Sequence, residues 1–179
     1  MKASLLIVVT SMLVSCSSED PGKLDRILAQ GDPDEVWSDI QDLILRHKEE
    51  EDWSRVEENI IVLGSMDRWI LNGGFKGYLR MPASSTCGEA IRALGDIGQP
   101  DFQTVLKRAI SAFPGSIELE DVDGRQAFEL DDEAMAILEE ADGYYFANYE
   151  TGIYEAIADY IRKNRDALSW LDDPKYQEP

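Results

Sequence analysis

The sequence has 179 residues, which is enough for one domain of ordinary size and too few for two well-formed cores. Its 36 Asp and Glu against 17 Lys and Arg give a formal charge of −19, which repels phosphate backbones and disfavours direct nucleic-acid binding. One His and two Cys exclude a Cys/His zinc site and a disulfide framework, and nothing in the composition indicates a cofactor.

The first residues resemble a targeting signal. One base, Lys2, precedes an apolar run over residues 5–14 that is too short to span a bilayer. The run leads into Leu13-Val14-Ser15-Cys16, which is similar to a bacterial lipobox, where a peptidase cuts before a lipid-modified cysteine. The sequence therefore predicts a cleaved lipoprotein signal peptide over residues 1–15. An ordinary signal peptide and a buried N-terminal strand are the alternatives.

Cleavage before Cys16 would leave a lipid anchor on that cysteine and a tether over residues 16–22. Each buried CH₂ of an acyl chain contributes about 0.8 kcal/mol, so the anchor would hold an anionic domain at a membrane surface that otherwise repels it. The expected location is the bacterial cell envelope. Ser17, rather than Asp, follows the cysteine, which resembles the outer-membrane sorting pattern of Gram-negative bacteria.

The second cysteine, Cys87, would be the one thiol of the mature chain, so no intramolecular disulfide could form. It lies at an expected helix start, where a thiolate can be activated by the helix dipole. No second thiol or nearby His supports such chemistry. We therefore interpret Cys87 as a small buried side chain.

The first expected helices begin at residue 24 and at Pro33, which follows the N-cap residue Asp32. The lone histidine, His47, falls on the apolar face of the second helix and is interpreted as a packing residue. A third, longer helix begins at Trp53 and continues to Asn72. The two glycines that follow Asn72 either end this helix or let it bend before a further apolar stretch.

Four further segments follow along the chain. Thr86 and Glu89 have the spacing of a capping box for one helix, and Pro100 begins another that Pro114 ends. Residues 117–130 are acidic and rich in turn signals. Asp131 is expected to cap a helix that ends before Gly143, and a last helix spans residues 154–165.

No strand pair is evident, so the predicted fold class is all-α. We expect a single compact bundle of about six to eight helices over residues 23–170, followed by a flexible tail over residues 171–179.

The charges are distributed unevenly. Residues 17–60 hold 14 acids and 5 bases, residues 61–116 hold 4 and 6, and residues 117–179 hold 18 and 5. On the helix after Pro33, Glu35, Asp39 and Asp42 recur every three or four residues, about 4.5 to 6 Å apart along the axis. Such a row can imitate a line of phosphates, so these three are candidate partner-binding residues. The alternative is a solvated face that keeps the protein soluble.

Familiar catalytic and metal-binding motifs do not fit. An EF-hand centred on Gly124 would have Leu119 and Leu130 at its two anchoring positions, where carboxylates are required. The glycines near residue 73 are followed by no Gly-Lys-Ser/Thr sequence. We therefore predict no catalytic residue, no metal site and no cofactor. A hydrolase with paired carboxylates stays open as an alternative, because such a pair is defined by a separation of about 5 to 10 Å in space.

The central residues resemble those of a known family. Asn72-Gly73-Gly74-Phe75, the aromatic Tyr78 and the stretch over residues 87–98 are similar to the C-terminal domain of the acidic DNA-mimic protein family. The resemblance covers residues 53–164. It implies an all-α fold, a homodimer, and carboxylates that are presented to a DNA-binding protein. Under it, the Asn-Gly-Gly-Phe motif and Tyr78 are architectural.

Together these features predict a non-catalytic acidic domain that binds a basic protein surface and is displayed as a membrane-anchored lipoprotein. The first alternative is a cytosolic DNA mimic that regulates a DNA-binding protein. The second is an envelope hydrolase.

Overall fold

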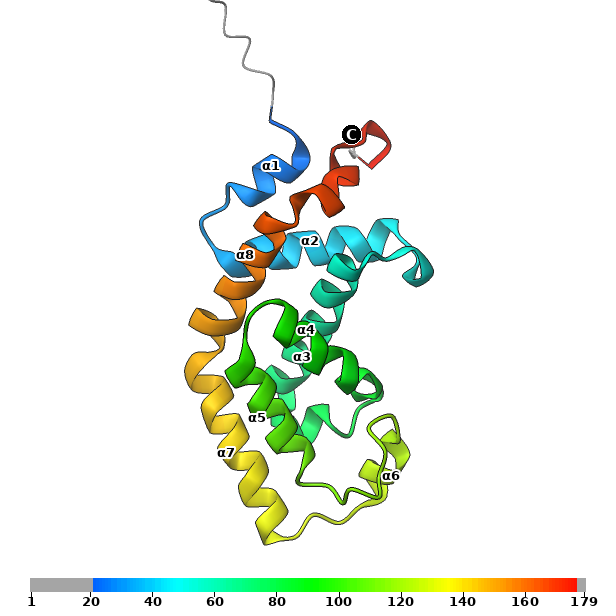
Figure 1. The fold of residues 1–179 in the computed structure, drawn as a ribbon, viewed down its shortest axis with the longest axis vertical. Coiled ribbons are helices and arrows are strands. Elements are labelled where there is room, and N and C mark those ends of the chain that lie inside the picture. The colour runs from blue at the N-terminus through cyan, green and yellow to red at the C-terminus, as the bar shows by residue number, and fades with distance from the viewer. Residues whose placement is uncertain (1–20, 177–179) are drawn as a thin grey trace, which may run out of the picture.

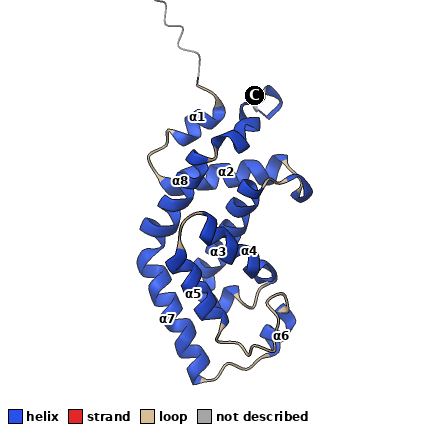
Figure 2. Ribbon diagram, in the orientation of Figure 1, coloured by secondary structure: helices blue, strands red, loops and turns tan. Residues whose placement is uncertain are grey.

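The computed structural model describes residues 21–176, and in this range the chain forms helices and no strand (Figures 1 and 2). The predicted all-α class is confirmed. The α-helices of this range are α1 (Lys23–Leu28), α2 (Pro33–His47), α3 (Arg55–Tyr78), α4 (Cys87–Asp96), α5 (Pro100–Ile110), α6 (Val122–Ala127), α7 (Asp132–Tyr149) and α8 (Glu155–Lys163).

Shorter helical turns join or extend these helices. A π-helix, η3 (Glu150–Tyr154), links α7 directly to α8. The 3-10 turns are η1 (Glu50–Asp52), η2 (Pro82–Thr86), η4 (Arg165–Asp172) and η5 (Pro174–Tyr176).

The predicted signal peptide and the lipid site Cys16 lie outside the described residues, as does the tether up to residue 20. Within residues 21–176, no helix is both long enough and apolar enough to cross a membrane.

Helix α3 is the central element and packs against α2, α4 and α7. On one side of the molecule, α7 and α8 form a long continuous ribbon, while α1, α2 and the C-terminal turns gather at one end and α6 lies at the other (Figure 1). The core is built from the apolar stripes that the sequence shows, and α3 contributes Ile60, Leu63, Met66 and Ile70, all essentially fully buried.

Helix starts follow capping chemistry in part. The side chains of Asp32 and Asp131 accept backbone N–H bonds from Asp34 at 3.0 Å and Ala134 at 2.8 Å, as predicted. The predicted capping box at Thr86 is wrong. The 3-10 turn η2 precedes α4, and within it the Thr86 hydroxyl donates to the carbonyl of Ala83 at 3.0 Å.

A capping box does occur at the start of α3. The Ser54 backbone N–H donates to the Glu57 carboxylate at 2.7 Å, while the Ser54 hydroxyl accepts from the Glu57 N–H at 3.4 Å. The prediction that Gly143 ends a helix is also wrong. The buried side chains of Ala141 and Tyr145 keep one packed face on either side of Gly143, so α7 continues.

The prediction of a flexible tail is wrong for residues 171–176, and residues 177–179 lie outside the described residues. Leu171 is fully buried, and the Leu24 backbone N–H donates to the Asp172 carboxylate at 3.0 Å. The ring of Tyr176 packs against Trp170 and against His47, with centroid distances of 4.9 and 5.3 Å. The packing role predicted for His47 is confirmed, and these contacts close the C-terminal turns over α1 and α2.

Candidate functional site

The Asn-Gly-Gly-Phe motif forms a bend inside α3. Gly74 has φ 63° and ψ −174°, a conformation essentially restricted to glycine, whereas α3 is otherwise helical. Of the two outcomes that the sequence left open, the helix bends. Asn72 is exposed, and its side-chain amide donates to the Arg68 carbonyl at 2.6 Å.

The bend releases the backbone N–H of Phe75, and a side chain from another helix satisfies it. The Asp142 carboxylate of α7 accepts this N–H at 2.7 Å, so it acts as an N-cap supplied from outside the helix. A Cβ atom on Gly74 would lie less than 3.0 Å from the same carboxylate. The Phe75 ring is buried and meets Tyr145 edge-on at 5.7 Å.

Tyr78 and Cys87 are buried together. The Cys87 thiol donates to the Tyr78 hydroxyl at 3.6 Å, and burial raises the pKa of the thiol. The interpretation of Cys87 as a packed, unreactive side chain is therefore supported. The structure thus places Gly74 at the helix bend and packs Phe75 and Tyr78 in the core, whereas Asn72 and Gly73 are exposed; the architectural role of the whole motif stays a prediction.

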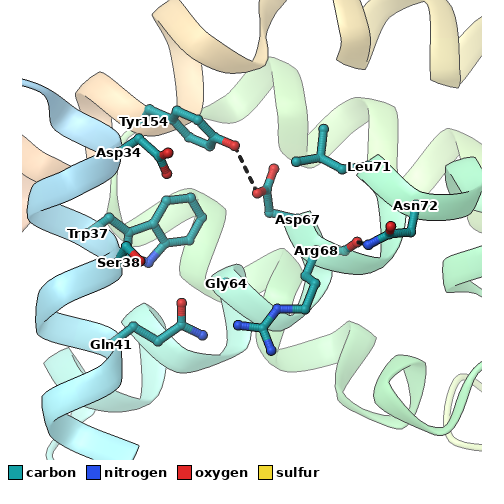
Figure 3. A pocket seen from close by; sticks show the side chains of 10 residues that line it. All are labelled: Asp34, Trp37, Ser38, Gln41, Gly64, Asp67, Arg68, Leu71, Asn72 and Tyr154. Carbon is teal, nitrogen blue, oxygen red and sulfur yellow. Dashed lines mark hydrogen bonds between the residues drawn. The ribbon is translucent and has the colours of Figure 1, made fainter.

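A hollow of about 260 Å³ opens between α2, α3 and the π-helix η3 (Figure 3). It is lined by Asp34, Trp37, Ser38, Gln41, Gly64, Asp67, Arg68, Leu71, Asn72 and Tyr154. The hollow contains two carboxylates, from Asp34 and Asp67. It also has an aromatic wall, because Trp37 and Tyr154 meet edge-on at 5.4 Å.

The carboxylate of Asp67 is held firmly. One oxygen accepts from the Tyr145 hydroxyl and the other accepts from the Tyr154 hydroxyl at 3.1 Å. Burial raises the pKa of Asp67, the two tyrosine bonds lower it in part, and the charge of Asp34 raises it further. Burial, together with the neighbouring Asp32, also raises the pKa of Asp34.

The π-helix brings both tyrosines to Asp67. In a regular α-helix, residues nine apart are separated by about two and a half turns and point to opposite faces. The wider turn over Glu150–Tyr154 changes this phase, so Tyr145 and Tyr154 reach the same carboxylate. Gly152 lets this turn lie close to the Phe102 ring, because a Cβ there would lie within 3.0 Å of it.

The three predicted partner-binding residues lie on the exposed face of α2, but they do not form a purely acidic surface. Asp39 accepts from the Gln30 side-chain amide at 2.8 Å. Asp39 and Asp42 line a shallow groove that also contains Lys23, Arg26 and Arg46. Glu35 is exposed and does not line this groove.

The most acidic stretch of the sequence is residues 118–133, around α6 and the start of α7, and Lys76, Arg80 and Lys107 from other elements share grooves with two of its acids, Glu129 and Glu118. Eight of its sixteen residues are acidic and all eight are exposed: Glu118, Glu120, Asp121, Asp123, Glu129, Asp131, Asp132 and Glu133. The one base in the segment, Arg125, is buried at 2% exposure and donates to backbone carbonyls that include Leu79 and Glu118. We call these eight residues the acidic segment.

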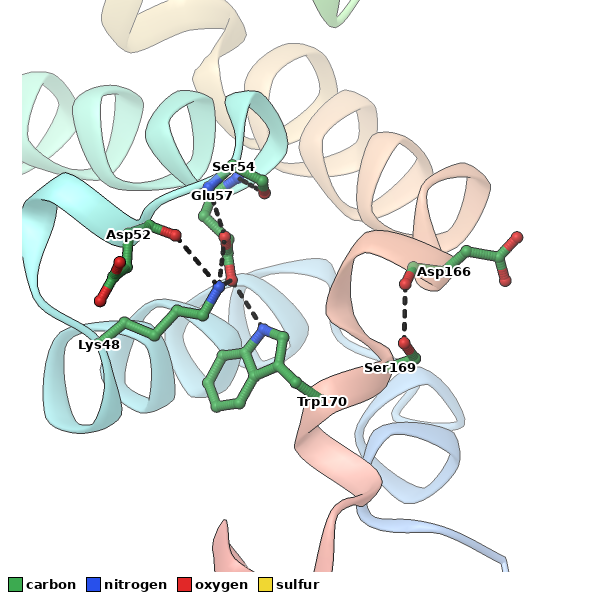
Figure 4. Close-up of polar contacts among 7 residues, drawn as sticks. All are labelled: Lys48, Asp52, Ser54, Glu57, Asp166, Ser169 and Trp170. Atoms are coloured by element: carbon green, nitrogen blue, oxygen red, sulfur yellow. Dashed lines mark hydrogen bonds and ion pairs between the residues drawn. The ribbon is translucent and has the colours of Figure 1, made fainter.

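A buried carboxylate, Glu57, joins α3 to the C-terminal turns (Figure 4). It forms an ion pair with Lys48 at 2.8 Å and accepts from the Trp170 indole N–H at 2.7 Å. Burial raises its pKa, but the bonds from Lys48 and Ser54 outweigh burial and hold the pKa below its ordinary value. This cluster stabilises the fold, and its oxygens are occupied by these partners.

Two carboxylates, one in the hollow and one at the helix bend, had a sequence signal that helical periodicity alone could have revealed. Asp67 lies four residues after Leu63 and three before Ile70, which places a carboxylate on the apolar face of α3. Asp142 occupies the same kind of position between Leu138 and Tyr145. Polar residues inside an apolar stripe need buried partners, but the partners themselves come from other helices.

The structure defines an all-α acidic domain in which no group of three or more His, Cys, Asp or Glu in residues 21–176 could hold a metal ion. A family model described as DMP19-like protein matches residues 51–164, which is more than half of the chain. The chain therefore belongs to the DMP19-like protein family. No curated protein and no solved structure matched the chain.

Proposed function

We propose that this protein is a non-catalytic interaction domain that uses exposed carboxylates to bind a basic protein surface, as DNA would. The observation that carries the proposal is the acidic segment, in which eight exposed acids surround a single buried base. Closely spaced carboxylates on a rigid helical surface provide the charge density that a DNA-binding surface accommodates. Membership of a DNA-mimic family supports this function.

The contact surface is proposed to centre on the acidic segment, with the α2 row as a second region. Three bases share the groove with Asp39 and Asp42, which reduces the local negative potential there. Bases also share grooves with Glu129 and Glu118 of the acidic segment, but its other six acids line no groove that contains a base. The partner's affinity should therefore depend more on the acidic segment than on Glu35, Asp39 and Asp42.

Two triple variants separate these surfaces at equal net charge. The first, Glu120→Gln/Asp123→Asn/Glu129→Gln, removes three of the eight charges of the acidic segment without touching the helix caps Asp121 and Asp131. The second, Glu35→Gln/Asp39→Asn/Asp42→Asn, neutralises the α2 row. We expect the first to weaken binding of the partner by about 3- to 150-fold, taking a modest contribution from each charge, and the second to weaken it less.

The partner can be obtained by copurification of the protein from its native cells. Its affinity is then measured between low and high salt and in competition with duplex DNA. If the protein mimics DNA electrostatically, its affinity for the partner should fall steeply as salt rises, and duplex DNA should displace it from the partner. Affinity that is unchanged by salt, or a complex that DNA does not disturb, would rule out the proposal.

We further propose that the domain is lipid-anchored through Cys16 in the bacterial envelope. The lipobox-like Leu13-Val14-Ser15-Cys16 supports this location. Mass spectrometry of the N-terminus should find that fifteen residues are lost and that Cys16 carries an acyl mass, while Cys16→Ser should move the protein out of the membrane fraction. Intact Met1 on protein from the cell interior would instead establish the cytosolic DNA mimic.

The hydrolase alternative has one counterpart in the structure, because Asp34 and Asp67 share a hollow. The two tyrosine hydroxyls that donate to Asp67 fix its carboxylate as a hydrogen-bond acceptor, and membership of a DNA-mimic family also favours binding over catalysis. Binding is therefore the better-supported use of this hollow.

A further inference from the structure

The hollow between α2 and α3 combines residues from two parts of the chain. Asp67, Arg68 and Tyr154 lie within the family match, whereas Trp37 and Gln41 on α2 lie before it. The hollow therefore combines residues inside the family match with residues of α2 that precede it.

An unsatisfied amide points into this hollow. The Gln41 side chain is only 9% exposed, and its amide group faces the space beside Gly64 and Arg68 (Figure 3). No residue of the described chain gives this amide a hydrogen bond. The amide atoms are not among the fully buried polar atoms that lack a partner, so they are open to water in the hollow, and a ligand with matching hydrogen-bonding groups can replace that water.

Gly64 provides the space for this amide. A Cβ atom at Gly64 would lie less than 3.0 Å from the end of the Gln41 side chain. A glycine inside a helix costs about 1 kcal/mol relative to alanine. The sequence thus keeps a residue that weakens α3 and allows Gln41 to lie over the helix at the edge of the hollow.

We propose that the hollow binds the guanidinium group of an arginine side chain that the basic partner presents. Asp67 and Asp34 supply the negative charge, the Gln41 amide oxygen supplies a neutral acceptor, and the edge-to-face pair of Trp37 and Tyr154 supplies an aromatic wall. This inference rests on the proposed function, because the arginine belongs to the protein that the acidic surface recruits.

The chemistry of the lining favours guanidinium. Guanidinium is planar, has five N–H donors and stacks on aromatic rings, so it can use carboxylate oxygens, an amide oxygen and a ring face together. Its partial dehydration is cheaper than that of an ammonium group. The Asp67 carboxylate is already oriented by two tyrosine hydroxyls, which lowers the cost of arranging the site.

Arg68, the one base that lines the hollow, can be used to test whether the bound ligand is a cation or an anion. Its positive charge opposes a bound cation, whereas it would attract a bound anion or the carboxylate of a zwitterion. Arg68→Gln should therefore tighten binding of a guanidinium by about two- to fivefold, which is the usual range for one partly exposed charge. Weaker binding in this variant would overturn the inference.

Direct binding can be measured by NMR titration of the full domain with N-acetyl-arginine amide. The matched control is N-acetyl-citrulline amide, which has the same shape and no charge. We expect saturable shifts of the Gln41 side-chain amide and the Gly64 backbone amide with the arginine compound alone. Equal shifts with citrulline, or no shift with either compound, would refute a guanidinium site.

Gln41→Met separates binding from stability. Methionine fills a similar volume and removes the unsatisfied amide, so the free energy of unfolding should be unchanged or higher. Binding of N-acetyl-arginine amide should fall on the order of tenfold, because a hydrogen bond to a charged group is lost. Unchanged binding in a folded Gln41→Met variant would overturn the role of this amide.

The source of the arginine is tested with the copurified partner. Gln41→Met should weaken binding of the partner as it weakens binding of N-acetyl-arginine amide. If the substitution weakens binding of N-acetyl-arginine amide alone, the hollow binds a free guanidinium compound and the inference about the partner is wrong. A partner that keeps its steep salt dependence while Gln41→Met has no effect would refute this inference and leave the proposed function intact.

Discussion

The bend in α3 gives a sharp prediction, because Gly74→Ala should break two features at once. Gly74 has φ 63° and ψ −174°, where a non-glycine residue is strained by about 1–3 kcal/mol. The added Cβ would also displace the Asp142 carboxylate, which accepts the Phe75 backbone N–H at 2.7 Å. Leaving that partly buried N–H unpaired costs about 1–3 kcal/mol more.

The expected loss is therefore about 2–6 kcal/mol, a large part of the 5–15 kcal/mol that stabilises a typical domain. The assay is urea unfolding followed by circular dichroism. Gly73→Ala is the matched control, because Gly73 is helical and has no atom within 4 Å of its Cβ position. It should leave stability unchanged or raise it by up to about 1 kcal/mol.

A double-mutant cycle tests the mechanism. Asp142→Ala should cost about 1 kcal/mol or more by removing the cap of Phe75. Because Gly74→Ala already displaces the same carboxylate, the double variant should lose less than the two single losses combined. If Gly74→Ala is as stable as Gly73→Ala, or if the two losses are fully additive, the proposed coupling between the bend and Asp142 is incorrect.

Three further predictions concern buried groups. The pKa of Glu57 is depressed in the folded protein, so its stabilising effect is complete above its unfolded pKa of about 4.3 and is lost as pH falls through the folded value. The urea midpoint of Glu57→Gln should accordingly be lower at pH 7 and fall less toward pH 3 than that of the unmodified protein; parallel curves would contradict this. In a Cys16→Ser background, iodoacetamide should label Cys87 on the order of 1,000-fold more slowly in native than in unfolded protein, because the thiol is buried and its pKa is raised; mass spectrometry would reveal fast native labelling if the thiol were reactive. Arg125→Met should cost about 3 kcal/mol or more, since it leaves the carbonyls of Leu79 and Glu118 without their donor, and a small shift in thermal midpoint would show that water replaces it.

Much of the fold follows from local sequence patterns. Apolar stripes at helical spacing predict the all-α class, and Asp32 and Asp131 mark two helix starts correctly. Errors occurred where a tertiary contact overrides a local signal. Gly143 usually marks a helix end, but packing of Ala141 and Tyr145 carries α7 through it. Thr86 has the spacing of a capping box, but the preceding 3-10 turn directs its hydroxyl to Ala83.

For the candidate sites as well, the sequence predicted the local features and the tertiary contacts decided the rest. The sequence identified the acidic character of residues 117–179 and the row on α2, because charge is a property of composition. It did not show that Lys23, Arg26 and Arg46 lie beside that row, or that Arg125 is withdrawn from the acidic segment. Whether a base cancels nearby carboxylates depends on which helices pack together, and sequence separation does not contain that information.

The sequence by itself determined the helical class, the strong negative charge and the position at which glycines interrupt the third helix. Only the tertiary structure decided which carboxylates are exposed and which are buried and hydrogen-bonded within the fold. By residue type alone, Glu57, Asp67 and Asp142 cannot be told from the surface acids. In the structure each has a hydrogen-bond partner from a distant part of the chain. The physical reason is that burial and hydrogen bonding set the free energy of a charge, and both arise only when the helices pack.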